Sequence, residues 1–174
     1  YGERLELTIE GAVDRIEKLL ASSDNGRILK EGISTVIVGK PNAGKSSLLN
    51  TLLGEERAIV TEIAGTTRDV LEEQINLNGI ILNIIDTAGI RDTDDIVEKI
   101  GVDKARKYVK DADLILYVVD ASTNLDENDG EIMELLHGRR TIVLLNKSDL
   151  TPLTTAEDIR VPVSYTHLRA HETS

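Results

Sequence analysis

The chain has 174 residues, enough for one full domain and an appendage. Hydrophobic residues make up 40% of the chain, and because Phe and Trp are absent, the core must consist of Ile, Leu and Val. The net charge of −11 argues against direct binding of nucleic acid by this piece, and the absence of cysteine excludes disulfides and thiolate metal sites. The lack of cysteine fits a reducing cytoplasm, and no apolar run approaches the ~20 residues of a membrane span, so we expect a cytoplasmic protein without a membrane partner.

The first predicted element is an amphipathic helix over residues 8–20. Ile9, Val13 and Ile16 follow helical spacing along one face, and a polar cluster ends the pattern. The helix either packs on its own domain or is the end of a helical region of a larger protein. We expect the second, with residues 1–31 forming a helical stub of a neighbouring helical domain.

The next stretch has the form of a phosphate-binding loop. The sequence Gly39-Lys40-Pro41-Asn42-Ala43-Gly44-Lys45-Ser46 follows the apolar run 35–38 and precedes a helical pattern over 47–53. Strand, glycine-flanked loop and helix in this order are the context of a P-loop. The glycines let backbone N–H groups turn toward phosphate oxygens, and the helix N-terminus adds its positive dipole end. We therefore predict that Lys45 contacts the β- and γ-phosphates of a nucleoside triphosphate and that the Ser46 hydroxyl ligates Mg²⁺.

A polar loop over residues 55–69 leads into a predicted hairpin. Two strands, over 70–77 and 80–86, flank Asn78-Gly79, the strongest short signal for a tight antiparallel turn. Asp86 ends the second strand, where its carboxylate either holds Mg²⁺ through water or caps the following segment. Thr67, in the loop, either ligates Mg²⁺ when a γ-phosphate is present or is an ordinary loop threonine.

The remaining pattern alternates strands with helices. Strands are predicted over 114–120, 141–146 and 161–164, and helices over 97–110 and 129–136. This alternation predicts an α/β fold with a mostly parallel six-stranded sheet, one antiparallel edge strand and helices on both faces. The motifs fall at the carboxyl ends of strands or in loops beside them, where open α/β sheets bind ligands.

The most discriminating motif is Asn146-Lys147-Ser148-Asp149, which follows a buried strand. A carboxylate at this place accepts hydrogen bonds from the N1–H and the 2-amino group of guanine, a pattern that adenine does not offer. The alternative is a polar strand-to-helix turn. In this order after a P-loop, the motif favours a guanine nucleotide, GTP or GDP.

Together these motifs resemble those of the translation-factor-type small GTPases. Asp86-Thr87-Ala88-Gly89 matches the DxxG motif of these proteins, and Asn146-Lys147-Ser148-Asp149 matches NKxD. The similarity is closer still to the MnmE (TrmE) family of tRNA-modification GTPases, and it is carried by residues 39–50, 59–69 and 90–98 and by the lead-in 26–32. The match runs over residues 7–164.

The resemblance implies a Ras-like GTPase (G) domain over residues 32–164. In that family the domain is inserted in a helical domain, forms a G-domain homodimer, and acts with an MnmG-like flavoprotein on the wobble uridine of tRNA through the full-length protein. The implied GTP-binding residues are Asn42, Ala43, Gly44, Lys45, Ser46, Ser47, Thr61, Thr66, Thr67, Asp86, Gly89, Asn146, Lys147 and Asp149.

The resemblance also implies the parts that hydrolyse GTP. Ile90 stands where signalling GTPases place a Gln that orients the attacking water, and the family places Glu98 in that role. The alternative for Glu98 is a carboxylate at a helix N-terminus. Besides Mg²⁺ on Ser46, Thr67 and Asp86, a K⁺ ion is implied in place of an arginine finger. Its implied ligands are Asn42, Thr61, Ile63 and Thr66.

The end of the chain departs from this pattern. Residues 165–174 show no apolar periodicity, and we expect a foreign tail there in place of the family's final helix. A second function also stays open, a ribosome-assembly GTPase of the Era or Der type acting as a GTP-gated binding module. A folate-binding domain and a C-terminal cysteine in the full gene would distinguish the two.

Overall fold

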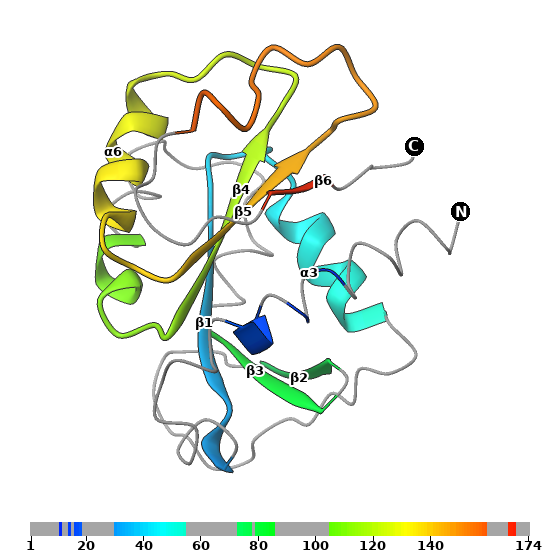
Figure 1. Ribbon diagram of the computed structural model, residues 1–174, viewed down its shortest axis with the longest axis vertical. Coiled ribbons are helices and arrows are strands. Elements are labelled where there is room, and N and C mark those ends of the chain that lie inside the picture. Colours follow the sequence, from blue (N-terminus) through cyan, green and yellow to red (C-terminus); the bar gives the residue numbers. More distant parts are fainter. Residues whose placement is uncertain are drawn as a thin grey trace.

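The computed structural model describes residues 11, 14, 16–18, 30–54, 73–77, 79–85, 105–159 and 167–169. Its sheet has six strands in the order β2-β3-β1-β4-β5-β6 (Figure 1). The β2–β3 pair is antiparallel and every other neighbouring pair is parallel, which confirms the predicted mostly parallel sheet with an antiparallel edge. The strands are β1 (Ile33–Val38), β2 (Glu73–Leu77), β3 (Ile80–Ile85), β4 (Leu114–Asp120), β5 (Thr141–Asn146) and β6 (His167–Arg169).

The hairpin forms where the Asn-Gly pair predicts it. Leu77 lies opposite Ile80, and Gly79 in the turn has φ 92° and donates its N–H to the Asn76 Oδ1 atom at 2.8 Å. The positive φ is the conformation that glycine adopts without steric cost. The described part of β2 begins at Glu73, within the predicted range.

Helices cover both faces of the sheet, as predicted (Figure 1). On one face α3 (Lys45–Gly54) buries Leu49 and Leu52. On the other, α6 (Glu127–Leu136) and the helical residues 105–109 pack together. Successive residues of β4 alternate between the two cores: the first contains Leu114, Leu116 and Val118, and the second Ile115, Tyr117 and Val119. Because both faces of β4 contact a core, successive residues are apolar, and the strand appears in the sequence as a continuous apolar run.

The N-terminal helical residues contact the domain at Ile16, whose exposed fraction is 2% and which lies in the core on the α3 side. Helix α6 begins at Glu127 rather than at the predicted residue 129. The reason is a capping box, in which Asp126 accepts from the Asp129 N–H and Asp129 accepts from the Asp126 N–H. None of the described helices is long and apolar enough to cross a membrane.

The last strand that the structure describes lies beyond the residues predicted for the last strand. The predicted strand over 161–164 is outside the described residues, and the structure places β6 at His167–Arg169, beside β5. Strand β6 therefore falls in the segment predicted to be a foreign tail. The prediction that a final helix is missing concerns residues 165–174, of which only 167–169 are described.

Candidate functional site

The phosphate loop leaves β1 at its carboxyl end and runs to the start of α3. A Cβ atom on Gly39 would lie 2.3 Å from the Val118 carbonyl oxygen, so only glycine lets the loop pass this close to β4. Asn42 and Gly44 have φ of 60° and 103°, and the Leu48 N–H donates to the Gly44 carbonyl at 2.9 Å. Asn is among the few residues that tolerate a positive φ. The loop conformation therefore depends on the residue types that the motif supplies.

Lys45 folds back over this loop. Its Nζ donates to the carbonyl oxygens of Gly39 at 2.9 Å and Lys40 at 2.6 Å. Burial lowers the pKa of Lys45 from its ordinary 10.5 to about 8. Ser46 and Ser47 follow in the first turn of α3, and the N–H groups and positive dipole end of a helix N-terminus favour an anion. A cation, a row of N–H groups and a hydroxyl thus meet at one end of the loop.

The motif over residues 146–149, which favours a guanine nucleotide, contacts the phosphate loop directly. Asn146, at the end of β5, is 4% exposed, and its Nδ2 donates to the Ala43 carbonyl oxygen at 3.0 Å. Ala43 itself is buried. This hydrogen bond joins two motifs that lie 103 residues apart in the sequence. It brings together the two candidate subsites, one for phosphates and one for a base.

Lys147 is held by a carboxylate that the sequence analysis missed. Its Nζ lies 2.8 Å from Asp120 Oδ2, and Asp120 Oδ1 accepts from the N–H and the hydroxyl of Ser122 at 2.9 and 2.6 Å. Burial alone would raise the pKa of Asp120, but the hydrogen bonds from Lys147 and Ser122 and the Lys147 charge lower it. In the sequence, Asp120 comes directly after an apolar run, as Asp86 comes after a largely apolar one, and this is the signal by which Asp120 could have been found.

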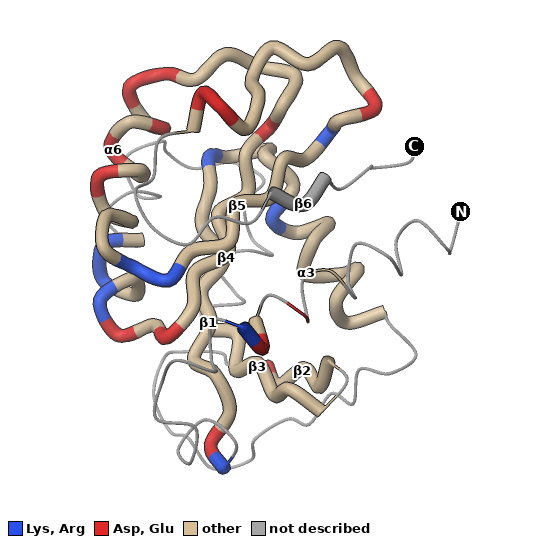
Figure 2. Tube along the Cα trace, in the orientation of Figure 1, with Lys and Arg blue, Asp and Glu red and all other residues tan. Residues whose placement is uncertain are grey.

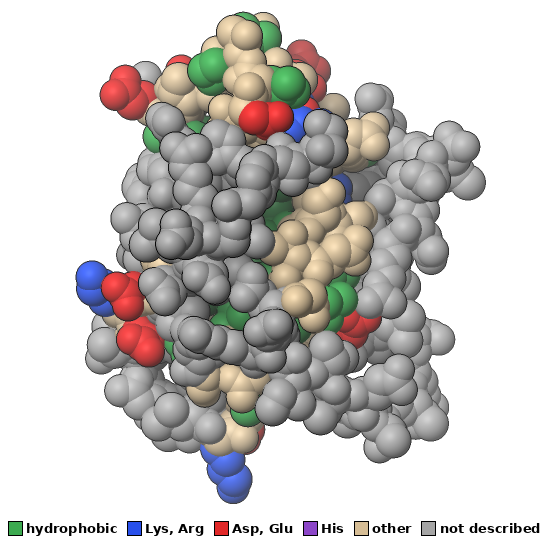
Figure 3. Space-filling model, turned by 90° about the vertical axis from the view of Figure 1, so that its right-hand side faces the viewer, with side chains coloured by type: hydrophobic (Ala, Val, Ile, Leu, Met, Phe, Trp, Pro, Cys, Tyr) green, Lys and Arg blue, Asp and Glu red, His purple; other side chains and the backbone are tan. Residues whose placement is uncertain are grey.

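The rest of the motif forms an exposed turn. Lys147 has φ 56°, and its carbonyl accepts from the Leu150 N–H at 3.1 Å. Asp149 lies in this turn with its side chain exposed. Leu150 and Leu153, which follow, are 50% and 54% exposed, and Figure 3 shows hydrophobic side chains at this end of the molecule. A carboxylate at the surface beside Lys147 is available to a ligand that approaches the loop.

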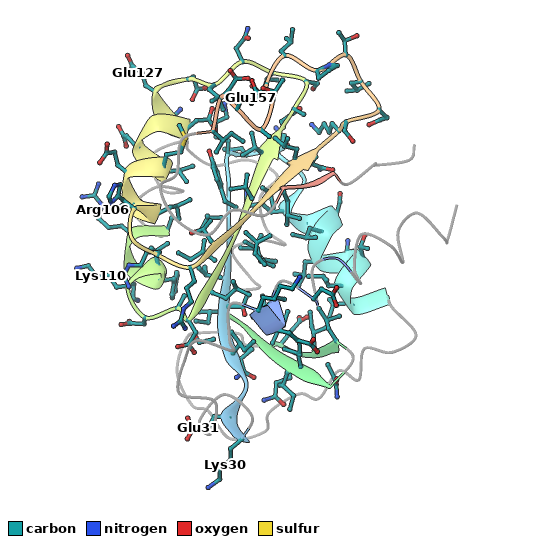
Figure 4. All side chains as sticks on the ribbon, viewed as in Figure 1. Lys30, Glu31, Arg106, Lys110, Glu127 and Glu157 are labelled. Carbon is teal, nitrogen blue, oxygen red and sulfur yellow. The ribbon has the colours of Figure 1, made fainter. Side chains whose placement is uncertain are left out.

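The surroundings of the site are acidic. Figure 2 shows Asp and Glu along α6 and in the loops beyond β4 and β5. In Figure 4, Glu127 and Glu157 lie at this end of the molecule, while Arg106 and Lys110 point outward, away from the sheet. Attraction for a polyanionic ligand must therefore come from the loop itself, through its N–H groups and Lys45.

The other predicted site residues lie outside the described part of the chain. Within the residues that are described, no group of three or more His, Cys, Asp or Glu is arranged to hold a metal ion; the hydroxyl of Ser46, the predicted Mg²⁺ ligand, lies at the start of α3. The predicted residues not described are Thr61, Ile63, Thr66, Thr67, Asp86, Gly89 and Glu98.

Comparisons with known proteins agree with this geometry. The family model described as 50S ribosome-binding GTPase matches residues 34–147. The chain is 56% identical over 161 residues to the tRNA modification GTPase MnmE of Lachnoclostridium phytofermentans, an alignment that covers 92% of this chain and 35% of the relative. It is 64% identical over 135 residues to MnmE of Clostridioides difficile, with 78% and 29% covered.

The chain thus spans about a third of the length of these curated relatives. Among solved structures, the G domain of the T. maritima FeoB iron transporter is similar at a TM-score of 0.53 and 21% identity, covering 81% of this chain and 88% of that one. At this identity the similarity shows the fold alone.

Proposed function

The chain belongs to the GTPase family described as 50S ribosome-binding GTPases, enzymes that bind and hydrolyse GTP, and on that premise we propose that it is the GTPase domain of an MnmE-like protein in tRNA wobble-uridine (U34) modification. The observation that carries the proposal is the similarity to MnmE relatives along most of the chain. In this proposal residues 1–31 are a helical stub, 32–164 the G domain and 165–174 a tail whose residues His167–Arg169 pair with β5 as β6. The cytoplasm, where tRNA is modified, is the compartment it implies.

The phosphate loop binds the triphosphate through its N–H groups and Lys45. To reach the β- and γ-phosphates, the Lys45 ammonium exchanges the Gly39 and Lys40 carbonyls for phosphate oxygens. The hydroxyl of Ser46 fits a hard divalent cation, and Ser46, Thr67 and Asp86 would hold Mg²⁺. When bound, Mg²⁺ supplies positive charge beside the phosphate oxygens.

Guanine is selected by Asp149, which accepts from the N1–H and the 2-amino group. Asn146 fixes the base loop against the phosphate loop, and Lys147, oriented by Asp120, packs along the base. Because a site built to accept these hydrogen bonds rejects bases that lack them, ATP should not compete with GTP. Competition with a fluorescent guanine nucleotide tests this directly, and equal competition by ATP would contradict the proposal.

Hydrolysis requires a group that orients water, and Ile90 is unable to do so because it has no polar side chain. We assign this role to Glu98. The Glu98→Ala variant should retain GTP binding and lose most turnover, since a water-positioning group acts chiefly in the transition state. Near-normal turnover would return Glu98 to the role of a carboxylate at a helix N-terminus.

A monovalent cation would take the place of an arginine finger. Asn42 is exposed at the edge of the phosphate loop, so its side-chain oxygen is available, and Thr61, Ile63 and Thr66 would complete an oxygen cage suited to K⁺. Bound there, K⁺ would supply charge between the β- and γ-phosphates and favour pairing of two G domains. Turnover in KCl should exceed turnover in NaCl at equal ionic strength, and this difference should vanish in Asn42→Ala.

The partners of the full-length protein are an MnmG-like flavoprotein and tRNA. The description of the matching family mentions the ribosome, which supports the competing proposal of a ribosome-assembly GTPase acting as a GTP-gated binding module. Deleting the full gene and measuring both U34 modification and ribosomal subunit profiles separates the two. Loss of U34 modification with normal subunits supports the first, and the reverse result supports the second.

A further inference from the structure

Lys40, the second residue of the phosphate loop, is bound to the start of α6. Its Nζ lies 2.6 Å from Asp129 Oδ2 and 2.9 Å from Asp126 Oδ2. The Lys40 side chain is 18% exposed, the Asp129 side chain 2% and the Asp126 side chain 51%. These contacts join segments that are 86 residues apart in the sequence, counted from Lys40 to Asp126.

Asp129 is the buried centre of this arrangement. Its Oδ1 accepts from the Tyr117 hydroxyl at 3.1 Å, and its Oδ2 accepts from the Asp126 N–H at 3.0 Å. Tyr117, on β4, is fully buried. A buried carboxylate is strongly destabilising unless a cation balances it, and Lys40 is the cation that the described structure places beside it.

The backbone of Lys40 faces the other way, into the phosphate loop. Its carbonyl oxygen accepts from Lys45 Nζ at 2.6 Å and from the Ala43 N–H at 3.3 Å. One residue therefore binds α6 with its side chain and the phosphate-binding lysine with its carbonyl. A displacement of Lys40 would move the loop backbone that is bonded at Ala43, and also the carbonyl on which Lys45 rests before it turns to the phosphates.

The charge of Lys40 is maintained by its partners. Burial alone would lower the pKa of Lys40, but the hydrogen bonds and charges of Asp129 and Asp126 raise it above its ordinary value. A hydrophobic contact would hold the loop without the desolvation penalty of an ion pair, which often adds little to stability. The ion pair instead fixes the position of the Lys40 ammonium, because the two carboxylates, held by their own hydrogen bonds, define where Nζ lies.

We propose that Lys40 is a positioning residue that anchors the phosphate loop to the N-terminus of α6, and that this anchor sets how long a guanine nucleotide stays bound. The inference rests on the proposed function, since it concerns the same nucleotide. In this inference α6, which belongs to neither the P-loop motif nor the base-binding motif, contributes to keeping the nucleotide bound.

The test measures release of a fluorescent GDP analogue from the 174-residue chain by stopped flow, together with the melting temperature without nucleotide. Lys40→Met should release GDP about tenfold faster, and Lys40→Arg, which keeps the charge, should lie within about twofold of the unaltered chain. Lys107→Met is the matched control, because Lys107 is an exposed lysine that lies over the Tyr108 ring, 5.4 Å from its centre. It should leave the release rate unchanged.

A double variant separates positioning from stability. In Lys40→Met/Asp129→Asn the uncompensated buried charge is removed, so the melting temperature should recover most of what Lys40→Met loses, while release stays fast. Recovery of the slow release rate in the double variant would overturn the inference, as would unchanged release in folded Lys40→Met. If the unaltered chain binds no guanine nucleotide, the proposed function fails first and this inference fails with it.

Discussion

Replacing Asp120 with Asn should weaken binding of every purine nucleotide that Lys147 packs against. The substitution keeps the size of the side chain and leaves Oδ1 able to accept from Ser122. It replaces Oδ2, which lies 2.8 Å from Lys147 Nζ, with an amide nitrogen, so that two donors face each other. Lys147 then loses the partner that orients it.

The size of this effect follows from the exposure of the pair. A hydrogen bond to a charged group contributes about 1.5–3 kcal/mol, and exposed ion pairs contribute about 0–1 kcal/mol. The side chains of Lys147 and Asp120 are 24% and 13% exposed, which places the pair between these limits. We therefore expect a loss of about 1–2 kcal/mol in binding, a rise in Kd of about 5- to 30-fold.

Titration with fluorescent GDP and with its inosine counterpart, which lacks the 2-amino group, tests the reasoning. Because the proposed function places Lys147 on the face of the base and Asp149 at its edge, Asp120→Asn should weaken both nucleotides by the same factor. Ser122→Ala, which keeps the carboxylate and removes one hydrogen bond, is the control and should have a smaller effect. A Kd for GDP within about twofold of the unaltered chain would refute the dependence of Lys147 on Asp120.

Three further predictions follow from the same structure. Asp149→Asn should weaken GDP and favour xanthosine nucleotides, whose 2-oxo group needs a donor, as competition binding would reveal. Gly39→Ala should lower the free energy of unfolding by about 1–3 kcal/mol in urea titrations, because its Cβ meets the Val118 carbonyl, whereas Gly54→Ala, whose Cβ meets nothing within 4 Å, should not. Since the folded pKa of Asp120 lies below its ordinary 3.8, its pairing stabilises the fold fully above that value and is lost as pH falls through the lowered pKa. The difference in unfolding free energy between the unaltered chain and Asp120→Asn should therefore close in acid.

Local patterns were sufficient to predict the strands β1 to β5 and the principal loop, but not β6. The continuous apolar runs became β4 and β5, the Asn-Gly pair became the β2–β3 turn, and the glycine-flanked motif became the loop before α3. Each of these is encoded by residues adjacent in the sequence, through backbone preference or burial on both faces. The start of α6 is also encoded locally, by the capping pair Asp126 and Asp129 three residues apart, which places it two residues before the predicted start at residue 129.

The ion pairs around the site were not predictable in the same way. Lys147 meets Asp120 because β4 and β5 are parallel neighbours in register, with Asp120 opposite Asn146. Lys40 meets α6 because the phosphate loop and the loop after β4 emerge at the same end of adjacent strands. Neither contact follows from spacing in the sequence, since each depends on strand order and register that only the folded sheet defines.

The phosphate loop is held at three places by three different kinds of contact. Gly39 lies against the β4 backbone, Lys40 pairs with Asp129 of α6 and its N-cap Asp126, and the carbonyl of Ala43 accepts from Asn146 at the end of β5. A loop fixed at its start, its second residue and its middle has little freedom left to lose when a ligand binds, which lowers the entropic penalty of binding. It also means that a substitution at any one anchor leaves two in place. The anchors should therefore act non-additively, and combining Lys40→Met with Asn146→Ala should accelerate GDP release by more than the product of the two single effects.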